Sequence, residues 1–493
     1  MVSGLLILSS ILFPIIAGVL LFLIKPLKED KARNVYVGCM LIISSIITLC
    51  CLFTAGGSVT LWSVTENVSI GLRADGLSKI FGTLMSLMFT VVGFYAMGYM
   101  EHEENKNRFF AFYLMVFGVL NGIYLSSNLL TMYLFYEMMT LISLPLVLHE
   151  LTGEAIDAGK KYLYYSIAGA FLSLVAIFLI YTYAGSYSFT GGGIVDPSKV
   201  AGHENLLLAF VLLAIIGFGC KAGLFPLHDW LPTAHPVAPA PASAVLSGVI
   251  TKSGVIAIIR VVFYSVGADF IRGTWVQYTW IILTLVTVFL GSMMAYLEKG
   301  LKKRLAYSSV SQVSYVLFGL STLHPLGFLG ALLHVIFHSI IKDDLFLVAG
   351  AIIHQTGITV VDGLKAIGKR MPITIWGFTF ASLALVGIPP FTGFVSKWFL
   401  CSGALDANIG AAGYIGPVVL LVSALLTAGY LLPITIDGFF PGHDFDTTGL
   451  EKCEPKPIML VPIIILSLLA LVFGMFPGFI ENGIMNIISE IGL

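Results

Sequence analysis

The chain has 493 residues, of which 58% are hydrophobic and 11% are charged, whereas a soluble protein carries about 25% charged residues. This composition excludes water as the solvent for most of the surface. The net charge of -1 gives no indication of nucleic-acid binding.

The apolar runs predict helices, because in lipid only helices and closed barrels satisfy the polar backbone. The runs are continuous over about 20 residues and do not alternate with period two, which excludes a barrel. The first run begins at once, with no basic residue before it and no evident cleavage site, so we interpret it as a retained helix. The sequence predicts an all-α integral membrane protein of about fourteen transmembrane helices, at residues 4–24, 35–55, 76–99, 109–126, 129–148, 162–183, 205–225, 239–264, 276–297, 305–321, 326–354, 373–402, 411–433 and 457–477. Residues 478–493 predict a short amphipathic helix at the membrane interface.

The positions of lysine and arginine orient these spans, since basic loops stay on the cytoplasmic side. With the N-terminus outside, the inner loops hold seventeen of the 26 basic residues and the outer segments hold four. We therefore predict a multi-pass protein of the cell (cytoplasmic) membrane with both termini on the outer side. The inner residues are Lys25, Lys28, Lys31, Arg33, Lys106, Arg108, Lys160, Lys161, Lys299, Lys302, Lys303, Arg304, Lys365, Lys369, Arg370, Lys452 and Lys456, and the outer ones are Arg73, Lys79, Lys199 and Arg272.

The other five basic residues fall inside apolar spans: Lys221, Lys252, Arg260, Lys342 and Lys397. Arg260 lies near a helix end, where we expect its side chain to snorkel to the interface. The four lysines would together cost about 10 kcal/mol if they were unpaired and dry at mid-membrane. They therefore predict a water path or buried partners.

Glu137 is the only acid in the middle of the fifth span, and Lys221 lies mid-span in the seventh. We interpret them as a buried pair that titrates as a unit, with a purely structural ion pair as the alternative. Burial disfavours the charged form of a lysine, and a nearby carboxylate restores it. Movement of the carboxylate would therefore let the lysine release or take up a proton.

The eleventh span contains His334, His338 and Lys342 in the run HVIFHSIIK. A spacing of four residues keeps all three on one helix face. Imidazole accepts a proton on one nitrogen and donates from the other, so this face predicts a proton relay. Structural core histidines are one alternative; a zinc site is disfavoured by the lysine and by the lack of an HExxH glutamate.

Two more lysines complete the set of predicted proton-pathway residues. Lys252 lies among serines and glycines in SGVITKSGV, which suits close helix packing and bound water, and Lys397 follows GIPPFTGFVS. A structural ion pair is the alternative for each. His228, Asp229 and His235, in the proline-rich run after the seventh span, are candidates for the inner mouth of the pathway or for surface structure. Asp75 is predicted to cap a helix at the outer face.

Prolines interrupt the seventh and twelfth spans, in GFGCKAGLFPLHDWLP and ALVGIPPFTGFVSKWF. Interrupted helices in corresponding positions favour an inverted repeat with a pathway at its centre, although ordinary proline kinks are the alternative. We predict two inverted five-helix repeats, spans four to eight at residues 101–265 and spans nine to thirteen at 266–435. A three-helix segment at residues 1–100 precedes them, and a loop, the last span and the interfacial helix follow at 436–493.

Nothing in the sequence predicts a cofactor, a metal site or a catalytic residue. The six cysteines are scattered and form no CxxC pair, which disfavours iron–sulfur or zinc ligation: Cys39, Cys50, Cys51, Cys220, Cys401 and Cys453. No nucleotide or flavin motif is present either, which disfavours an enzyme that acts alone.

Three long motifs resemble the antiporter-like subunits of respiratory complex I: PLHDWLPTAHPVAPAPASAVLSGVITKSG, KKRLAYSSVSQVSYVLFGL and HVIFHSIIKDDLFLVAG. Similar subunits occur in multisubunit Mrp-type cation/proton antiporters and in membrane-bound energy-converting hydrogenases. The resemblance covers about residues 70–430. It implies fourteen helices with inverted repeats, the pair of Glu137 and Lys221, a connecting lysine at Lys252, the histidine–lysine relay and a far lysine at Lys397.

The resemblance also implies a function and partners. It implies a proton-translocating subunit, carrying protons alone or with sodium, in a membrane-bound redox-driven complex such as an energy-converting hydrogenase or a complex I relative. Its partners would be lipid and other membrane subunits, including further antiporter-like ones. The alternatives are an Mrp-type sodium/proton antiporter subunit without redox chemistry and a purely structural membrane arm.

This sequence departs from the family pattern in two ways. Asp343 and Asp344 directly follow Lys342, where the family usually has small or neutral residues, and an ion pair with them would change the role of that lysine. The chain also ends soon after the fourteenth span, so the long lateral helix of the family's distal member is not expected.

Overall fold

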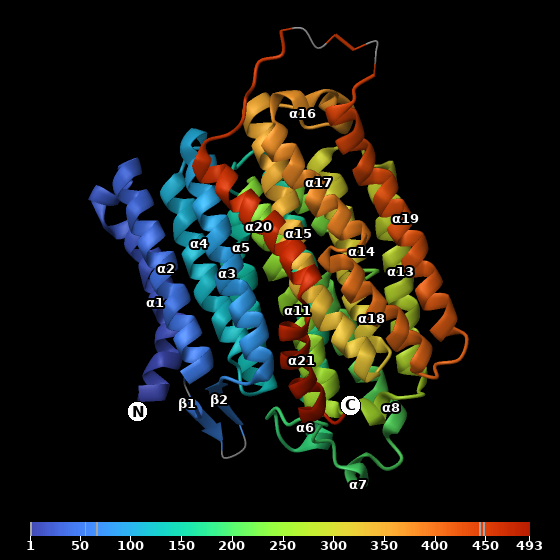
Figure 1. Ribbon diagram of the computed structural model, residues 1–493. Coiled ribbons are helices and arrows are strands. Elements are labelled where there is room, and N and C mark those ends of the chain that lie inside the picture. Colours follow the sequence, from blue (N-terminus) through green and yellow to red (C-terminus); the bar gives the residue numbers. More distant parts are fainter. Residues whose placement is uncertain (1, 55, 66–67, 443–444, 447–448) are drawn as a thin grey trace.

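The computed structural model describes residues 2–54, 56–65, 68–442, 445–446 and 449–493. Residue 55, the last of the predicted second span, lies outside the described residues, as do residues 443–444 and 447–448 of the predicted C-terminal segment. Within the described residues the protein is a bundle of helices with a single two-stranded sheet (Figure 1).

The elements occur along the chain in the following order. Residues up to 271 form α1 Val2–Leu23, η1 Lys25–Lys28, α2 Asp30–Thr54, β1 Ser58–Thr65, β2 Val68–Arg73, α3 Gly76–Tyr99, η2 Met100–His102, α4 Lys106–Tyr124, α5 Leu129–Val147, α6 Gly153–Ala184, α7 Pro197–Val200, α8 Glu204–Ala222, α9 Leu231–Val237, α10 Ala240–Val245, η3 Leu246–Ile250, α11 Lys252–Ile259, η4 Arg260–Val266 and α12 Ala268–Ile271. Later residues form α13 Trp275–Leu297, α14 Leu301–Ser321, α15 Pro325–Thr356, η5 Val361–Leu364, α16 Ile367–Arg370, α17 Pro372–Val386, α18 Thr392–Asp406, α19 Ala412–Phe439, α20 Pro457–Met475 and α21 Gly478–Glu490.

Ten helices in the described part of the chain are long and apolar enough to cross a membrane, so the chain is a multi-pass membrane protein. The other predicted spans correspond to helices that are more polar or shorter. Helix α14 carries four serines between residues 308 and 314, and α15 carries Lys342, Asp343 and Asp344. The predicted span 373–402 is divided between α17 and α18.

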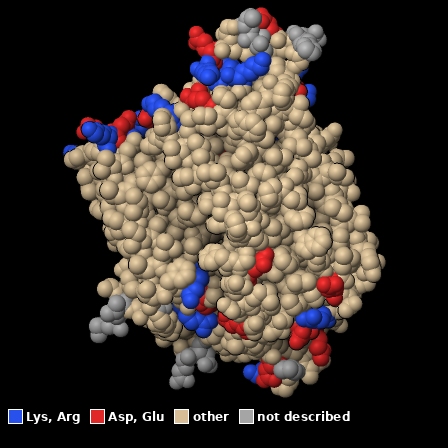
Figure 2. Space-filling view, in the orientation of Figure 1, with Lys and Arg blue, Asp and Glu red and all other residues tan. Residues whose placement is uncertain are grey.

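Charge is segregated along the bundle. On the face shown in Figure 2, charged side chains gather toward the two ends, and a broad uncharged belt lies between them. Helix α16, which carries Lys369 and Arg370, lies at one end, and both chain termini lie at the other (Figure 1). The two termini thus share one end of the bundle, and the assignment of that end to the outside stays a prediction.

Strands β1 and β2 form an antiparallel hairpin that the sequence did not predict, because two short strands leave no signal among the long apolar runs. The hairpin is tied to the bundle by backbone bonds: Arg73 N–H donates to Leu125 O at 2.6 Å, and Ser127 N–H donates to Gly71 O at 3.0 Å. It therefore lies over the connection between α4 and α5.

Both spans predicted to be interrupted are interrupted. Helix α8 ends before Gly223, with φ 78°, and α17 ends before Gly387, with φ 93°. Glycine adopts this left-handed conformation at the least cost and commonly ends a helix. The chain then resumes in α9 and in α18; the end of α8 is buried within the bundle, whereas the end of α17 is half-buried.

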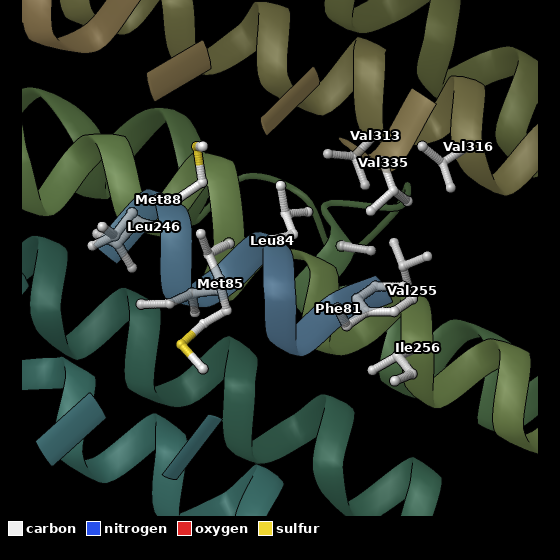
Figure 3. Close-up of a cluster of buried hydrophobic side chains, with 14 of the residues drawn as sticks. Phe81, Leu84, Met85, Met88, Leu246, Val255, Ile256, Val313, Val316 and Val335 are labelled. Carbon is white, nitrogen blue, oxygen red and sulfur yellow. The ribbon is translucent and has the colours of Figure 1, made fainter. Parts of the chain in front are cut away.

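The predicted eighth span, residues 239–264, is buried along its whole length but is not a regular helix. Helices α10 and α11 alternate with two π-helical segments, η3 and η4. Apolar side chains from this segment pack against those of α3, α14 and α15 (Figure 3), among them Phe81, Leu84, Met85, Met88, Leu246, Val255, Ile256, Val313, Val316 and Val335. Polar groups of this segment consequently meet protein rather than lipid.

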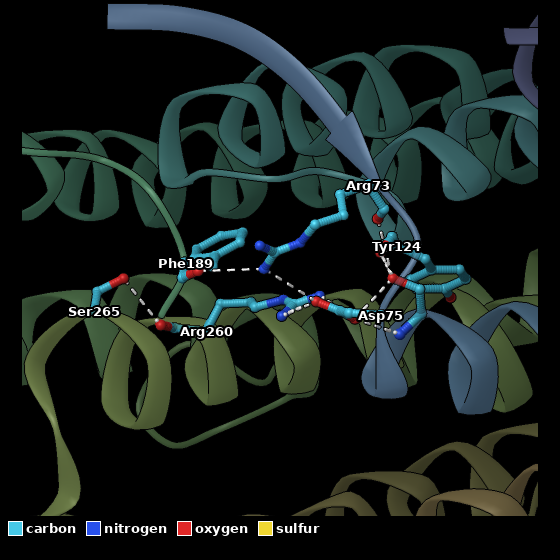
Figure 4. A network of polar contacts seen from close by, with 7 residues as sticks. Arg73, Asp75, Tyr124, Phe189, Arg260 and Ser265 are labelled. Carbon is cyan, nitrogen blue, oxygen red and sulfur yellow. Dashed lines mark hydrogen bonds and ion pairs between the residues drawn. The ribbon is translucent and has the colours of Figure 1, made fainter. Parts of the chain in front are cut away.

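Arg260 does not snorkel, and that prediction was wrong. Its side chain is only 1% exposed and forms an ion pair with Asp75 at 2.7 Å (Figure 4). Its guanidinium carbon lies 4.7 Å from the ring centroids of Phe189 and Tyr264. The predicted cap is confirmed, because Asp75 also accepts a hydrogen bond from Ser78 N–H at 3.0 Å. Burial alone would raise the pKa of Asp75, but the charge and hydrogen bond of Arg260 lower it overall. Asp75 therefore both caps α3 and neutralises Arg260, and the spacing of these residues in the sequence cannot reveal the second role.

Candidate functional site

The centre of the candidate site is a contact between Lys252 and His338. Both side chains are buried, and Lys252 Nζ lies 2.7 Å from His338 Nδ1 and 2.6 Å from the carbonyl oxygen of Ser247. A charged lysine only donates, so His338 Nδ1 accepts in this arrangement and Nε2 carries the ring hydrogen. A proton can therefore pass from the lysine to the imidazole along an existing hydrogen bond.

His334 extends this contact along α15 into a file of ionisable side chains. Its Nε2 lies 3.1 Å from Gln312 Oε1 and its Nδ1 lies 2.9 Å from Ser396 Oγ. Because an amide oxygen only accepts, Nε2 donates and Nδ1 accepts from the serine. The rings of His334 and His338 stack with centroids 6.0 Å apart, and no hydrogen bond between them is found among the described residues. Transfer between the two rings requires a water or a ring movement.

Lys397 lies at the end of this file, one residue after Ser396. It is half-buried, and its Nζ donates to two backbone carbonyls at the end of α17, Leu385 O at 2.6 Å and Val386 O at 2.8 Å. Helix ends leave such carbonyls without intrahelical partners, and they attract a cation. Tyr315 lies between Lys397 and the relay, since its ring is 5.3 Å from Nζ and stacks on His334 at 5.5 Å. The break in the helix thus creates the site of the lysine charge.

Lys221 forms a second centre on α8. Its Nζ is completely buried, donates to Thr140 Oγ1 and to Tyr162 OH at 3.4 Å, and lies over the rings of Tyr136 and Tyr162 at 5.0 and 5.3 Å. Glu137 precedes Thr140 by one turn of α5 and is half-buried, with Oε1 lacking a hydrogen-bond partner among the described residues. No direct ion pair joins Glu137 to Lys221 in the described structure; the lysine donates to the hydroxyl of Thr140 instead.

The two centres lie on adjacent helices. Helix α8 and helix α11 pack closely, because a Cβ added at Gly254 would lie 2.5 Å from the carbonyl oxygen of Phe218. No hydrogen bond connects Lys221 with Lys252 in the part of the chain that is described. The structure therefore brings Lys252, His338, His334 and Lys397 together and holds Lys221 apart, one helix away.

Lys342 is turned away from the acids that follow it. Its Nζ is buried and donates to Leu305 O at 3.0 Å on α14. Asp344 instead accepts a hydrogen bond from Ser467 Oγ at 2.6 Å on α20. Successive residues of a helix point in different directions, which is why neither adjacent acid pairs with the lysine.

The three candidate inner-mouth residues have different surroundings. Asp229 forms a partly exposed ion pair with Lys161. Burial lowers the pKa of His228. His235 is fully buried against the ring of Phe346 at 4.8 Å, and burial lowers its pKa to about 3, reinforced by the charge of Lys302. Only His235 reaches into the bundle, and it is neutral at ordinary pH.

Sequence reasoning missed the hydroxyl and amide partners of the file: Thr140, Tyr162, Ser247, Gln312, Tyr315 and Ser396. A signal existed for two of them, because Ser396 precedes Lys397 and Gln312 is an amide within an apolar span. Serines and tyrosines are common in membrane helices, so the others carry no distinguishing pattern.

A multi-pass helical bundle with lysines and histidines in hydrogen-bonded contact at its centre defines the class of polytopic membrane proteins with a buried file of ionisable groups. A family model described as NADH:quinone oxidoreductase/Mrp antiporter, transmembrane, matches residues 126–431, and one described as NADH-ubiquinone oxidoreductase (complex I), chain 5 N-terminus, matches residues 62–110. The chain belongs to this family of antiporter-like subunits, as the sequence resemblance predicted.

Two curated relatives illustrate the range of the family. The chain is 32% identical over 427 residues to NADH-quinone oxidoreductase subunit N of Desulforudis audaxviator (strain MP104C), covering 84% of this chain and 82% of the relative. It is 31% identical over 445 residues to hydrogenase-4 component B of Escherichia coli (strain K12), covering 86% of this chain but only 65% of the relative. This chain thus spans about two thirds of the hydrogenase component.

Solved structures share the fold over nearly the whole chain. A chain of the membrane-bound sulfane sulfur reductase, an archaeal respiratory membrane complex, superposes with a TM-score of 0.84 at 21% identity, covering 99% of this chain and 97% of that one. A chain of the Mrp complex from Dietzia sp. DQ12-45-1b gives a TM-score of 0.82 at 23% identity, covering 99% and 98%. At these identities the similarity establishes the fold.

Proposed function

We propose that this chain carries protons, alone or with sodium, across the cell membrane as the ion-pumping subunit of a membrane-bound redox-driven complex. The observation that carries the proposal is the 2.7 Å contact between Lys252 Nζ and His338 Nδ1 at the centre of the bundle. Buried charge is costly in a membrane and is retained there mainly where it serves transport.

The proposed route enters from the inner side near α8 and α9 and passes Lys221 before Lys252. It then crosses His338 and His334 and leaves by Lys397, with Lys342 and Glu137 setting the charge around it. Lysine suits this role because a dry environment disfavours its charged form, so a small electrostatic change moves its proton.

The proposal includes the finer architecture. It has fourteen spans and both termini on the outer side. Two inverted repeats, at residues 101–265 and 266–435, lie between a three-helix segment at 1–100 and a C-terminal segment at 436–493. In this arrangement the breaks after α8 and α17 take corresponding positions. In support, each broken helix is followed by a short connection and lies beside a lysine, Lys221 in one case and Lys397 in the other.

The names of two relatives support the proposal that the chain belongs to a redox-driven complex. They include a quinone oxidoreductase subunit and a hydrogenase component. The alternative, a subunit of an Mrp-type sodium/proton antiporter without redox chemistry, draws on the family description and on the shared fold. Genes for hydrogenase or iron–sulfur subunits beside this one would favour the first, and sodium-dependent proton exchange without a reductant would favour the second.

The test is proton transport by membrane vesicles that contain the complex with Lys221→Ala. Transport should fall to the level of vesicles that lack the chain, while the amount of assembled complex is unchanged. Lys199→Ala is the matched control, because Lys199 is an exposed lysine outside the bundle centre and its loss should change nothing. Wild-type transport by assembled Lys221→Ala complexes would remove Lys221 from the route and contradict the proposal.

A further inference from the structure

Asp343 is a buried acid for which the route above has no role. It lies in the middle of α15, its side chain is 0% exposed, and neither carboxylate oxygen finds a hydrogen-bond partner among the described residues. Its neighbour Asp344, equally buried, accepts a hydrogen bond from Ser467 on one oxygen, and only its other oxygen lacks a partner among the described residues. A carboxylate left alone in a dry interior is costly, so the unpartnered oxygens of Asp343 indicate a bound proton or a proton donor close by.

The space around Asp343 is shaped for a carboxyl group. A Cβ at Gly248 would lie only 1.9 Å from Asp343 Oδ1, so the carboxyl fills the place that a side chain on η3 would take. Ser339, one turn earlier on α15, donates to the carbonyl oxygen of Gly248 and fixes η3 against α15. A π-helical turn such as η3 is frequent at functional sites because it re-aims the residues around it.

The charged and titratable groups facing Asp343 come from three helices. Lys252 follows Gly248 by four residues, on the same face of its segment, and its charge interacts with that of Asp343. Tyr113 on α4 also interacts with the acid, although its hydroxyl donates to Phe89 O at 2.8 Å. Asp344 is the third, on α15 itself. Lys252 is therefore the basic group whose charge couples to Asp343, and because no ion pair joins the two in the described structure, a water or a side-chain movement must complete the path between them.

We propose that Asp343 is a further proton-carrying residue, which gives Lys252 a second proton partner besides His338. In the step toward Asp343 an N–H bond of the Lys252 ammonium breaks and an O–H bond forms on the carboxylate, leaving a neutral amine and a neutral acid. In the reverse step the acid returns this proton to the lysine. While the acid keeps the proton, a lysine recharged from the side of Lys221 can donate to His338 Nδ1. The inference rests on the proposed function, because it needs Lys252 on the proton route.

This arrangement lets the protonation state of Asp343 control how readily Lys252 gives up its proton. When Asp343 is charged, it holds the proton on Lys252; when Asp343 is protonated, the lysine loses that attraction and its proton is more easily passed to the histidine. Because the acid, the lysine and the imidazole are all buried, each transfer changes charge in a low-dielectric site, where electrostatic coupling is strong. Asp343 would thus control when Lys252 releases a proton to His338.

Asp343→Asn tests the inference, with Asp344→Asn as the matched control on the adjacent, equally buried acid. Proton transport by assembled complexes should fall at least about tenfold in Asp343→Asn and stay near wild type in Asp344→Asn. Infrared difference spectra between resting and driven states should show a protonated carboxylic acid band that Asp343→Asn abolishes and Asp344→Asn retains. Wild-type transport by Asp343→Asn, or a band that survives this substitution, would overturn the inference.

A second measurement covers the case in which Asp343→Asn does not assemble. The Asp344→Asn chain, isotope-labelled at the aspartate carboxyl carbon, should still show an isotope-sensitive band of a protonated acid, and its absence would overturn the inference. The proposed function fails separately: it is contradicted if Lys221→Ala keeps wild-type transport. Loss of transport in Lys221→Ala together with an unaffected Asp343→Asn contradicts only the role of Asp343.

Discussion

The charge of Lys397 is held by backbone carbonyls instead of an acid. Leu385 and Val386 supply them because α17 ends at the break before Gly387. A neutral dipole attracts an ammonium less rigidly than a carboxylate does, so the lysine stays able to lose its proton. At the residue scale, then, the break and the lysine form one structural unit.

His334→Gln tests the relay at a single residue. Glutamine can hydrogen-bond to Ser396 and Gln312 but cannot pick up and release a proton at neutral pH, so we expect transport to fall at least about tenfold with assembly preserved. His354→Gln, near the end of the same helix and half-buried, is the control. Dye-reported proton uptake by vesicles measures both; equal uptake by the two variants would show that His334 is structural.

Individual ionisable residues could be predicted from the sequence, whereas their partners could not. A lysine inside an apolar run is costly in any fold, which singled out Lys221, Lys252 and Lys342. The partners depend on which helices meet. Thr140, not Glu137, receives the Lys221 hydrogen bond, and Asp75, which lies far earlier in the chain, neutralises Arg260.

Helices α6 and α8 owe their close approach to two facing glycines. A Cβ at Gly217 would lie 2.5 Å from Gly169 O, and a Cβ at Gly169 would lie 2.6 Å from Gly217 O. Small residues at such contacts let membrane helices pack backbone to backbone. This contact fixes the position of Lys221, one turn further along α8.

Gly217→Leu should therefore destabilise the protein by about 1–3 kcal/mol, because an overpacked contact forces the helices apart. Thermal unfolding of the purified protein would register this as a lower midpoint. The same substitution at Gly153, where nothing lies within 4 Å of an added Cβ, should leave the midpoint nearly unchanged. Equal midpoints for the two variants would show that the α6–α8 contact is loose.

Long apolar helices were the most predictable elements, and irregular ones the least. The bounds of α3 and α13 follow the predicted spans 76–99 and 276–297 closely, since each is a single uninterrupted run. The π-helical turns η3 and η4 leave no pattern in the local sequence. The hairpin β1–β2 was missed for the same reason.

The pair of Arg260 and Asp75 links distant parts of the molecule. Asp75 caps α3 in the N-terminal segment, Arg260 begins η4, and Phe189 from the loop before α7 lies over the guanidinium (Figure 4). The pair lies close to the start of α3, where the hairpin joins the bundle. It therefore holds three sequence-distant segments in one arrangement.

Arg260→Ala should cost about 3–5 kcal/mol, because it leaves Asp75 buried without a counter-charge. Arg260→Met combined with Asp75→Asn should recover most of that loss, since asparagine keeps the helix cap and neither residue is charged. Unfolding free energies in detergent would give both values. A double variant no more stable than Arg260→Ala would contradict the ion-pair account.

At the scale of the whole molecule, an uncharged belt on the face shown in Figure 2 covers an interior that holds buried ionisable side chains. The belt follows from composition and could be predicted at once, as could membership of the family. The order of the interior groups could not, because it depends on two helix breaks and on the packing of α11 against α15. The transport account rests on that interior order, with Lys252 at its centre.

The most direct test of this account is proton translocation by reconstituted vesicles containing the complete complex with Lys252→Met, with partner turnover measured in the same sample. Methionine preserves the length and the apolar contacts of the lysine but cannot carry a proton. We predict that the complex assembles and that proton translocation per turnover falls to the background of vesicles without the chain. Wild-type translocation per turnover in assembled Lys252→Met complexes would contradict the account.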